Sequence, residues 1–278
     1  MPFSIYTNVP SLLIQQAMHR NQAGLERSLL RISSGFRINS AADDAAGVAF
    51  SARMDGQSRS HSVAERNTST AISMASTADD GAAEIGDVLT RMRELAVEAK
   101  DGVLTLTERA ALDVEYQELR AEIDRLAGAT TFNGTQLLSG SNTTIAFQVG
   151  IGSTVNDLIS VGFGGVSASN LGLAATSVTG SAATNATTAL TAIDLAIVDL
   201  GTTRTRLGSA VNRLGFALSH SQGMRSNLDA SVSAIRDADL AEEASHVARY
   251  QVLIEAGSAA LAAAHGLGAT LIKKLLDF

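Results

Sequence analysis

The feature that most constrains this chain is a narrow stripe of apolar residues at helical spacing, which recurs in several long segments. Between residues 71 and 99 the steps along the stripe alternate between four and three residues, which keeps one face of a helix against a partner helix. Its members are Ala71, Ala75, Ala78, Ala82, Ile85, Leu89, Met92, Ala96 and Ala99. Because the early members are small, the pattern predicts helices that approach each other closely.

Two more stripes predict further helices. Thr105 followed by Glu108 has the spacing of a capping box and begins a helix, whose stripe is Leu112, Tyr116, Leu119, Ile123 and Leu126. A longer stripe runs from Leu190 to Ile235 and predicts one helix of roughly 45–50 residues, about 70 Å long. Globular domains seldom contain such a helix.

Both ends of the chain carry apolar stripes as well. The N-terminal stripe includes Ile14, Met18, Leu25, Leu29 and Ile32, and the C-terminal stripe includes Val247, Ile254, Leu261, Leu271 and Leu275. Chain termini are normally frayed, so a stripe that reaches the end of a chain needs a partner. We therefore expect the two terminal helices to pack together and to serve as an assembly seam.

The middle of the chain differs in composition. Between Leu126 and Ile193 the only charged residue is Asp157, and Gly, Ser, Thr and Asn clusters separate short β-type runs at 145–150 and 157–163. This pattern predicts a β-hairpin or two on loops. The predicted fold class is therefore mainly α: an elongated, hairpin-like coiled-coil helical bundle with a small β-hairpin region and paired N- and C-terminal helices.

Composition argues against several functions. The net charge is −7 and the Lys and Arg residues are dispersed, which argues against nucleic-acid binding. The absence of Cys excludes disulfides and thiol chemistry. The uncharged run 256–272 is rich in Ala and Gly and too weakly apolar for stable membrane insertion. The first residues lack the features of a signal peptide, so export would use another route.

Candidate chemistry is sparse. Asp43 and Asp44 are adjacent, and side chains of adjacent helical residues point about 100° apart, so helix capping with Ser40 explains them better than acid–base catalysis does. The five His residues do not have the spacing of a zinc site, and no phosphate-binding or nucleophile motif is complete. We predict no enzyme activity, no metal and no cofactor.

Several segments together resemble bacterial flagellin. The most specific is ISSGFRINSAADDAAG at 32–47, followed by RMRELAVEAKDG at 91–102 and EIDRLAGATTFNGTQLLSG at 122–140. The segment 207–245, which includes IRDADLAEE, is similar to the family's return segment. These matches occur in order and cover nearly the whole chain.

The resemblance implies a structural subunit that assembles with itself into a helical filament for motility, through non-closing contacts. Residues 1–40 and 236–278 would form an inner core. Residues 41–175 and 183–235 would form an outer core with a β-hairpin at about 138–175. The segment 176–182 would be a short, outward-facing turn in place of outer variable domains.

The resemblance also implies site residues and partners. The joint between inner and outer core would consist of Gly35, Arg37, Ser40, Asp43, Asp44, Arg236 and Asp237. An innate immune Toll-like receptor would recognise Arg91, Leu95 and Glu115, with Leu95 exposed. Further partners would be a flagellar secretion chaperone at the C-terminal helix, the filament cap and the hook–filament junction proteins. The protein would be exported to the flagellum without signal-peptide cleavage.

Two other functions stay open at this point. A hook–filament junction protein shares both terminal helices but tends to show a PSDDP-like run where this chain has SAADDAAG. A flagellin homologue acting as a surface receptor or adhesin would need a binding groove lined by aromatic residues, which are scarce in this chain.

The C-terminus departs from the family in Gly266 and Gly268, each of which costs a helix about 1 kcal/mol relative to Ala.

Overall fold

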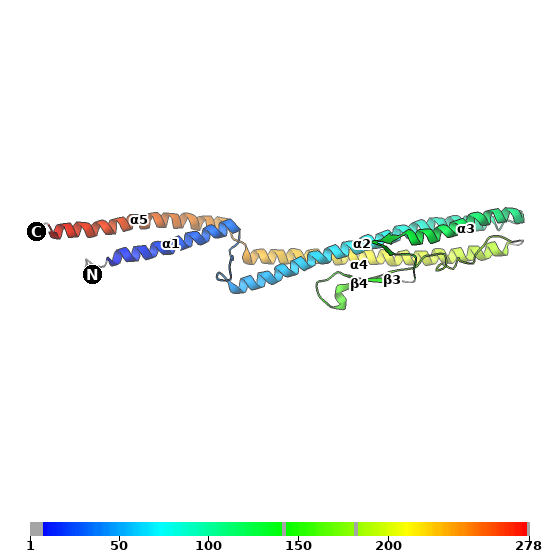
Figure 1. Ribbon diagram of the computed structural model, residues 1–278, viewed down its shortest axis with the longest axis horizontal. Helices are drawn as coiled ribbons and strands as arrows, with labels where there is room; N and C mark the ends of the chain where they lie inside the picture. The colour runs from blue at the N-terminus through cyan, green and yellow to red at the C-terminus, as the bar shows by residue number, and fades with distance from the viewer. Residues whose placement is uncertain (1–7, 141–142, 181–182, 277–278) are drawn as a thin grey trace. The chain divides into compact units, whose positions relative to one another are not determined.

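The computed structural model describes residues 8–140, 143–180 and 183–276, together with their side chains except those of residues 143 and 267–276. The fold is mainly α, as predicted (Figure 1). The described helices are α1 (Val9–Ser34), α2 (Ala45–Glu98), α3 (Leu106–Ala129), α4 (Thr184–Arg236) and α5 (Leu240–Leu276). The strands are β1 (Thr131–Phe132), β2 (Thr135–Gln136), β3 (Thr143–Gln148) and β4 (Leu158–Phe163), with a 3-10 turn η1 (Val155–Asp157) before β4.

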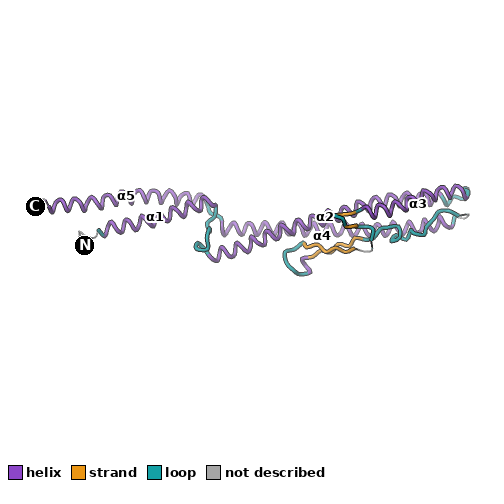
Figure 2. Tube along the Cα trace, viewed as in Figure 1, coloured by secondary structure: helices purple, strands orange, loops and turns teal. Residues whose placement is uncertain are grey.

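The chain divides into two compact units. Unit 1 combines both ends of the chain, residues 1–56 and 227–278, and unit 2 consists of residues 57–226. In unit 1, α1 and α5 run side by side (Figures 1 and 2). The predicted pairing of the terminal helices is therefore confirmed, whereas the division into inner and outer core remains a prediction about the filament.

The core of unit 2 lies along α2. All nine members of the predicted 71–99 stripe are completely buried. Helix α4 runs antiparallel to α2, because Asp79 pairs with Arg204 and Arg93 pairs with the earlier residue Asp194, each at 2.8 Å. The apolar face of α4 contributes Ile193, Leu200, Leu207 and Leu214 to the same core.

Helix α3 returns along α2 after a tight turn. The predicted capping box at Thr105 is present, because the Thr105 N–H and hydroxyl donate to Glu108 and the Glu108 N–H donates to the Thr105 hydroxyl. The buried Arg109 then donates to three main-chain carbonyls, those of Ala99, Asp101 and Gly180. One side chain thus joins the α2–α3 turn to the segment before α4.

The predicted β-hairpin at 145–163 is confirmed. Strands β3 and β4 are antiparallel, with Ile145 opposite Val161 and Phe147 opposite Ile159. Side chains alternate along β4, so that Ile159, Val161 and Phe163 face the core of unit 2. A second, very short hairpin joins β1 to β2 through Asn133 and Gly134, both in the left-handed conformation that a two-residue hairpin turn requires.

The segment before α4 departs from the prediction of an outward-facing turn at 176–182. Within its described part, Val178 is buried in the core. The Ser177 hydroxyl and the Val178 N–H both donate to Asp113 of α3, and the Thr176 hydroxyl is 2.8 Å from that of Tyr116. Residues 176–180 therefore lie against α3, because α3 offers polar partners beside an apolar site. Residues 181–182 lie outside the described residues.

Helix α5 continues through Gly266 and Gly268 to Leu276. Backbone helix is thus maintained across both glycines, and the predicted weakening there remains untested. The side chains of Leu271 and Leu275 lie outside the described residues. In the part of the chain that the structure describes, no helix combines the length and the apolar character that a membrane span needs.

Candidate assembly surface

The predicted seam lies between α1 and α5. Apart from Leu29, its described members are all half-buried, namely Ile14, Met18, Leu25, Ile32, Val247, Ile254 and Leu261. Glycines permit close approach at two points: a Cβ on Gly24 would lie 2.5 Å from Tyr250 Cζ, and a Cβ on Gly257 would lie 2.9 Å from Met18 Cγ. Small residues therefore bring these two helices together.

The N-terminal stripe needs one correction. Leu29 was placed on the seam, but its exposed fraction is 48%. Ser28, at 4% exposed, holds the inner position, because a three-residue step from Leu25 followed by a four-residue step leads to Ile32. The apolar character of Leu29 concealed the fact that a serine occupies this seam position.

A buried ion pair accompanies Ser28. Arg31 Nη1 donates to Glu243 Oε1 at 2.8 Å, and the Glu243 side chain is 7% exposed. Burial alone would raise the pKa of Glu243, but hydrogen bonds from Arg31 and Ser28 and the charge of Arg31 outweigh it, so the pKa is lowered. Removing one member would leave a buried charge unpaired, so this pair fixes the register of α1 against α5.

Several large aliphatic side chains stay exposed on the outward faces of this helix pair. Large aliphatic side chains between 42% and 63% exposed occur on both helices, namely Val9, Leu12, Leu13, Leu29 and Leu30 on α1 and Leu240, Val252 and Leu253 on α5. Apolar surface that is left exposed on a folded chain is a candidate interaction site.

Four of the predicted joint residues, Gly35, Arg37, Arg236 and Asp237, lie together where α1 ends and α5 begins. Gly35 ends α1 with φ +74°, and its N–H donates to the Arg31 carbonyl at 2.8 Å. Phe36 then forms an isolated antiparallel bridge with Asp237. Main-chain hydrogen bonds flank the bridge, from Arg37 N to the Arg236 carbonyl at 2.7 Å and from Ala238 N to the Gly35 carbonyl at 2.9 Å.

Side chains strengthen this joint. Arg37 Nη2 donates to the Ile235 carbonyl at 2.7 Å, and the Arg236 guanidinium lies 4.1 Å from the centre of the Phe36 ring, within cation–π range. The Ser233 hydroxyl donates to Asp237 at 2.6 Å. Arg37 thus contacts the return segment within its own chain.

The roles of Ser40, Asp43 and Asp44 differ from the predicted capping. Asp43 Oδ2 accepts hydrogen bonds from Asn39 N and from the N–H and hydroxyl of Ser40, and these bonds lower its pKa. They close a turn ahead of the helix, since α2 begins at Ala45. Asp44 is the capping residue, because its Oδ1 accepts from Gly47 N at 2.9 Å.

Two features of the joint escaped the sequence prediction. Ile38, flanked by polar residues, is 5% exposed. Asp239 accepts hydrogen bonds from Ala241 N and Glu242 N and so caps α5. The spacing of Asp239 before an apolar stripe was a usable signal, whereas nothing in the local sequence indicates that Ile38 is buried.

The three predicted receptor residues differ in exposure. Arg91 pairs with Glu115 at 2.7 Å and with Glu94 at 3.0 Å, and the side chains of Arg91 and Glu115 are 48% and 46% exposed. Leu95, which was expected to be exposed, is 1% exposed. Its burial follows from the packing of α2 against both α3 and α4, which widens the buried face at this level.

The candidate residues described above contribute to helix packing and to the joint. Among them, no group of three or more His, Asp or Glu side chains is arranged to hold a metal ion. The fold and the α1–α5 surface define a mainly α-helical structural protein in which the two ends of the chain meet.

Comparison with known proteins gives the family. Residues 5–143 match the bacterial flagellin N-terminal helical region, and residues 190–275 match the bacterial flagellin C-terminal helical region. A flagellin from Halalkalibacterium halodurans is 36% identical over 260 residues, which is 93% of this chain and 94% of the relative. The flagellar filament 33 kDa core protein of Treponema phagedenis is 31% identical over 272 residues, which is 93% and 94% of the two chains.

The chain belongs to the bacterial flagellin family and is a structural subunit of the flagellar filament. Flagellins form that filament outside the cell. A solved structure of a putative flagellar hook-associated protein from Vibrio parahaemolyticus has a similar fold, with a TM-score of 0.58 and 14% identity, over 70% of this chain and 100% of that one. At this identity the likeness concerns the fold alone.

Proposed function

We propose that copies of this chain assemble through the α1–α5 pair, which forms the inner core of the filament. The observation that supports this most strongly is the set of exposed aliphatic residues on both helices. Burial of such side chains against neighbouring copies removes apolar surface from water, which is the main driving force of association. The role of the protein is then structural rather than catalytic.

The test is assembly of purified protein seeded with sheared filament fragments and followed by electron microscopy. We expect Leu12→Asp, Leu253→Asp and the seam variant Leu261→Asp to abolish filaments while unit 2 melts as in the parent. Val103→Asp is the matched control, because Val103 is 86% exposed in the α2–α3 turn of unit 2. Normal filaments from all three α1 and α5 variants would contradict the proposal.

The joint would orient the inner core during assembly. The side chains of Arg37 and Asp237 add hydrogen bonds to the Ile235 carbonyl and from the Ser233 hydroxyl. We therefore expect Arg37→Ala and Asp237→Ala to change filament shape or yield more than they change secretion. Filament yield per secreted monomer separates the two effects.

Before assembly, the exposed aliphatic residues of α5 must be shielded from water and from premature association. We propose that a secretion chaperone binds the C-terminal helix, and that the cap and hook–filament junction proteins contact the same inner-core surface.

We also propose that the protein is exported without cleavage, which would leave the N-terminus intact except for loss of Met1. Mass spectrometry of extracellular protein tests this, since a shortened N-terminus would refute it.

A second, narrower role concerns host recognition. The exposed Arg91–Glu115 pair forms a charged patch on α2 and α3, and we propose that an innate immune Toll-like receptor binds it. Receptor-reporter cells should respond at least tenfold less to Arg91→Ala or Glu115→Ala monomer. Arg125→Ala, which removes an exposed pair with Glu122 on α3, is the control. Unchanged responses would remove this role.

A further inference from the structure

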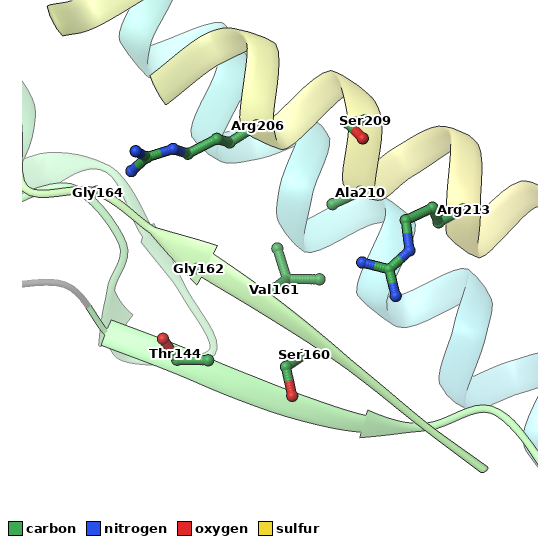
Figure 3. A pocket seen from close by; sticks show the side chains of 9 residues that line it. All are labelled: Thr144, Ser160, Val161, Gly162, Gly164, Arg206, Ser209, Ala210 and Arg213. Atoms are coloured by element: carbon green, nitrogen blue, oxygen red, sulfur yellow. The ribbon is translucent and has the colours of Figure 1, made fainter. Parts of the chain in front are cut away.

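An open groove of about 480 Å³ separates the β3–β4 hairpin from α4 within unit 2. Thr144, Ser160 and Gly162 line it from the hairpin, and Arg206, Ser209 and Arg213 line it from α4. Figure 3 shows both arginine side chains extending from α4, with Val161 and Ala210 between them. The groove is therefore lined by small residues of the hairpin on one side and by two cationic side chains of α4 on the other.

Nothing within the described residues neutralises these cations. Neither Arg206 nor Arg213 makes an ion pair in that part of the chain. Asp199 lines an adjoining cavity with Arg206, but no ion pair joins the two in the described structure. Residues seven apart on a helix lie about 10 Å apart along its axis. The groove thus presents two cations at that separation and suits a partner with two anions at the same separation.

Helix α2 carries such a pattern. Asp80, Glu84 and Asp87 are exposed along one face, and Asp80 and Asp87 are also seven residues apart. Within the described residues none of the three forms an ion pair, although Asp80 and Asp87 are close enough to Arg204 to raise its pKa, after the larger effect of Asp79. One chain therefore contains both halves of a charge-complementary surface.

We propose that the groove lined by Arg206 and Arg213 receives the Asp80–Asp87 face of α2 from a second copy of this chain. This contact rests on the proposed filament role and adds a lateral contact through unit 2. It joins unlike faces, so it propagates from copy to copy instead of closing into a dimer. Two charge pairs also fix how far one copy is shifted along the other, since a shifted copy would leave at least one of the charges without its partner.

The pairing has a defined order. Because α2 and α4 are antiparallel within one chain, copies that point the same way place Asp87 opposite Arg206 and Asp80 opposite Arg213. Inside one chain these residues cannot meet. The Asp79–Arg204 pair puts Asp80 level with residue 204, about nine residues or 13 Å from Arg213 along the helix.

Cysteine cross-linking tests this order directly, because the chain has no Cys. Filaments of the Asp87→Cys/Arg206→Cys variant, mildly oxidised and run on a non-reducing gel, should give a ladder of dimers and larger species. The same variant as dilute monomer should stay monomeric, since a disulfide needs Cα atoms within about 7 Å. Filaments of this variant without a ladder would overturn the proposal, and Asp87→Cys/Lys100→Cys is the control that should give none.

Charge exchange provides a second, independent test. Arg206→Asp/Arg213→Asp and Asp80→Arg/Asp87→Arg should each slow seeded elongation at least tenfold, and the variant with all four changes should recover the parent rate. The control Arg66→Asp/Lys100→Asp makes the same charge change as the arginine variant outside the groove and should elongate like the parent.

Two outcomes of the charge exchange count against the inference. Failure of the fourfold variant to recover, while the control assembles, would overturn it. Loss of assembly in the arginine variant alone would show that the groove binds another acidic surface, which also excludes the α2 face. Parent protein that never forms filaments would instead refute the proposed assembly function, so the two failures are distinguishable.

Discussion

Gly165 lies so close to the carbonyl oxygen of Gly140 that a Cβ atom on Gly165 would overlap it. The neighbouring hydrogen bond from Val166 N to the Leu138 carbonyl, at 2.8 Å, holds the two segments together. A side chain at 165 must therefore displace backbone rather than a flexible side chain.

We expect Gly165→Ala to destabilise unit 2 by about 3 kcal/mol, which is at the upper end for overpacking. Circular dichroism should show this as a lower melting temperature. Gly162→Ala is the control, because its Cβ would meet only Thr144 Oγ1, at 3.8 Å. Equal melting temperatures for the two variants would show that the 138–140 and 165–166 segments move apart easily.

A second prediction concerns the end of α1. Gly35 has φ +74° and open space around its Cβ position, so a substitution there is limited by backbone strain alone. Gly35→Ala should cost about 1–2 kcal/mol, the penalty of the left-handed conformation for an L-residue, and should reduce filament yield. Gly35→Asn should cost less, because Asn tolerates this conformation. If Ala and Asn behave alike, the strain argument is wrong.

A third prediction concerns the buried arginine of α3. Arg109→Met removes the donor for three carbonyls near the α2–α3 turn and should destabilise unit 2 by on the order of 3 kcal/mol, since buried acceptors lose their partners. Arg120→Met is the matched control on the same helix, because Arg120 reaches one carbonyl, that of Ala174. Chemical denaturation of both variants measures the difference, and a smaller effect at 109 than at 120 would refute the prediction.

A fourth prediction concerns pH. His61 is 7% exposed, and its Nδ1 lies 2.9 Å from the Ser221 hydroxyl between α2 and α4. Burial lowers its pKa below 6.5, the nearby His220 lowers it further and Glu65 opposes both, while Arg225 pairs with Glu65. The folded state thus favours the neutral ring.

The neutral ring contributes stability that is fully present above about pH 6.5 and is lost as the pH falls through the folded-state pKa. We expect the melting temperature of unit 2 to drop between pH 7 and pH 5. His61→Gln keeps a polar partner for Ser221 without a titrating ring and should flatten the profile in that range. His19→Gln, an exposed site, should leave the slope unchanged; equal slopes in both variants would contradict the prediction.

Helical spacing was enough to predict the core of unit 2, because a stripe such as Ala71 to Ala99 reports directly which face is buried. It was insufficient where a helix has two neighbours or where a polar residue lies on the buried face. Leu95 is buried by a second partner helix, which the spacing of the stripe does not reveal. Ser28 is buried against α5 because its side chain forms a hydrogen bond with Glu243, the partner of Arg31.

The site residues followed the same rule. Gly35 was predictable because a glycine after an apolar stripe is typical of a left-handed helix end. The Arg236–Phe36 contact and the main-chain bridge depend on partners about 200 residues away, and no local pattern encodes such a pairing. The helix start was predicted slightly too early, because Asp44 caps α2 and not Ser40 with Asp43. Helix ends are commonly uncertain by one or two residues.

Because unit 1 combines the first and last parts of the chain, its closure is delayed until translation or export is almost complete. Arg31 and Glu243 are 212 positions apart in sequence, so they meet only after a very long loop has closed, which is slow and entropically unfavourable. Unit 2 is continuous in sequence, so it can fold before the C-terminal part of the chain is available. A chain truncated before residue 240 would keep all of unit 2 and still lack the helix pair, so incomplete copies would be left without the surface that we assign to polymerisation.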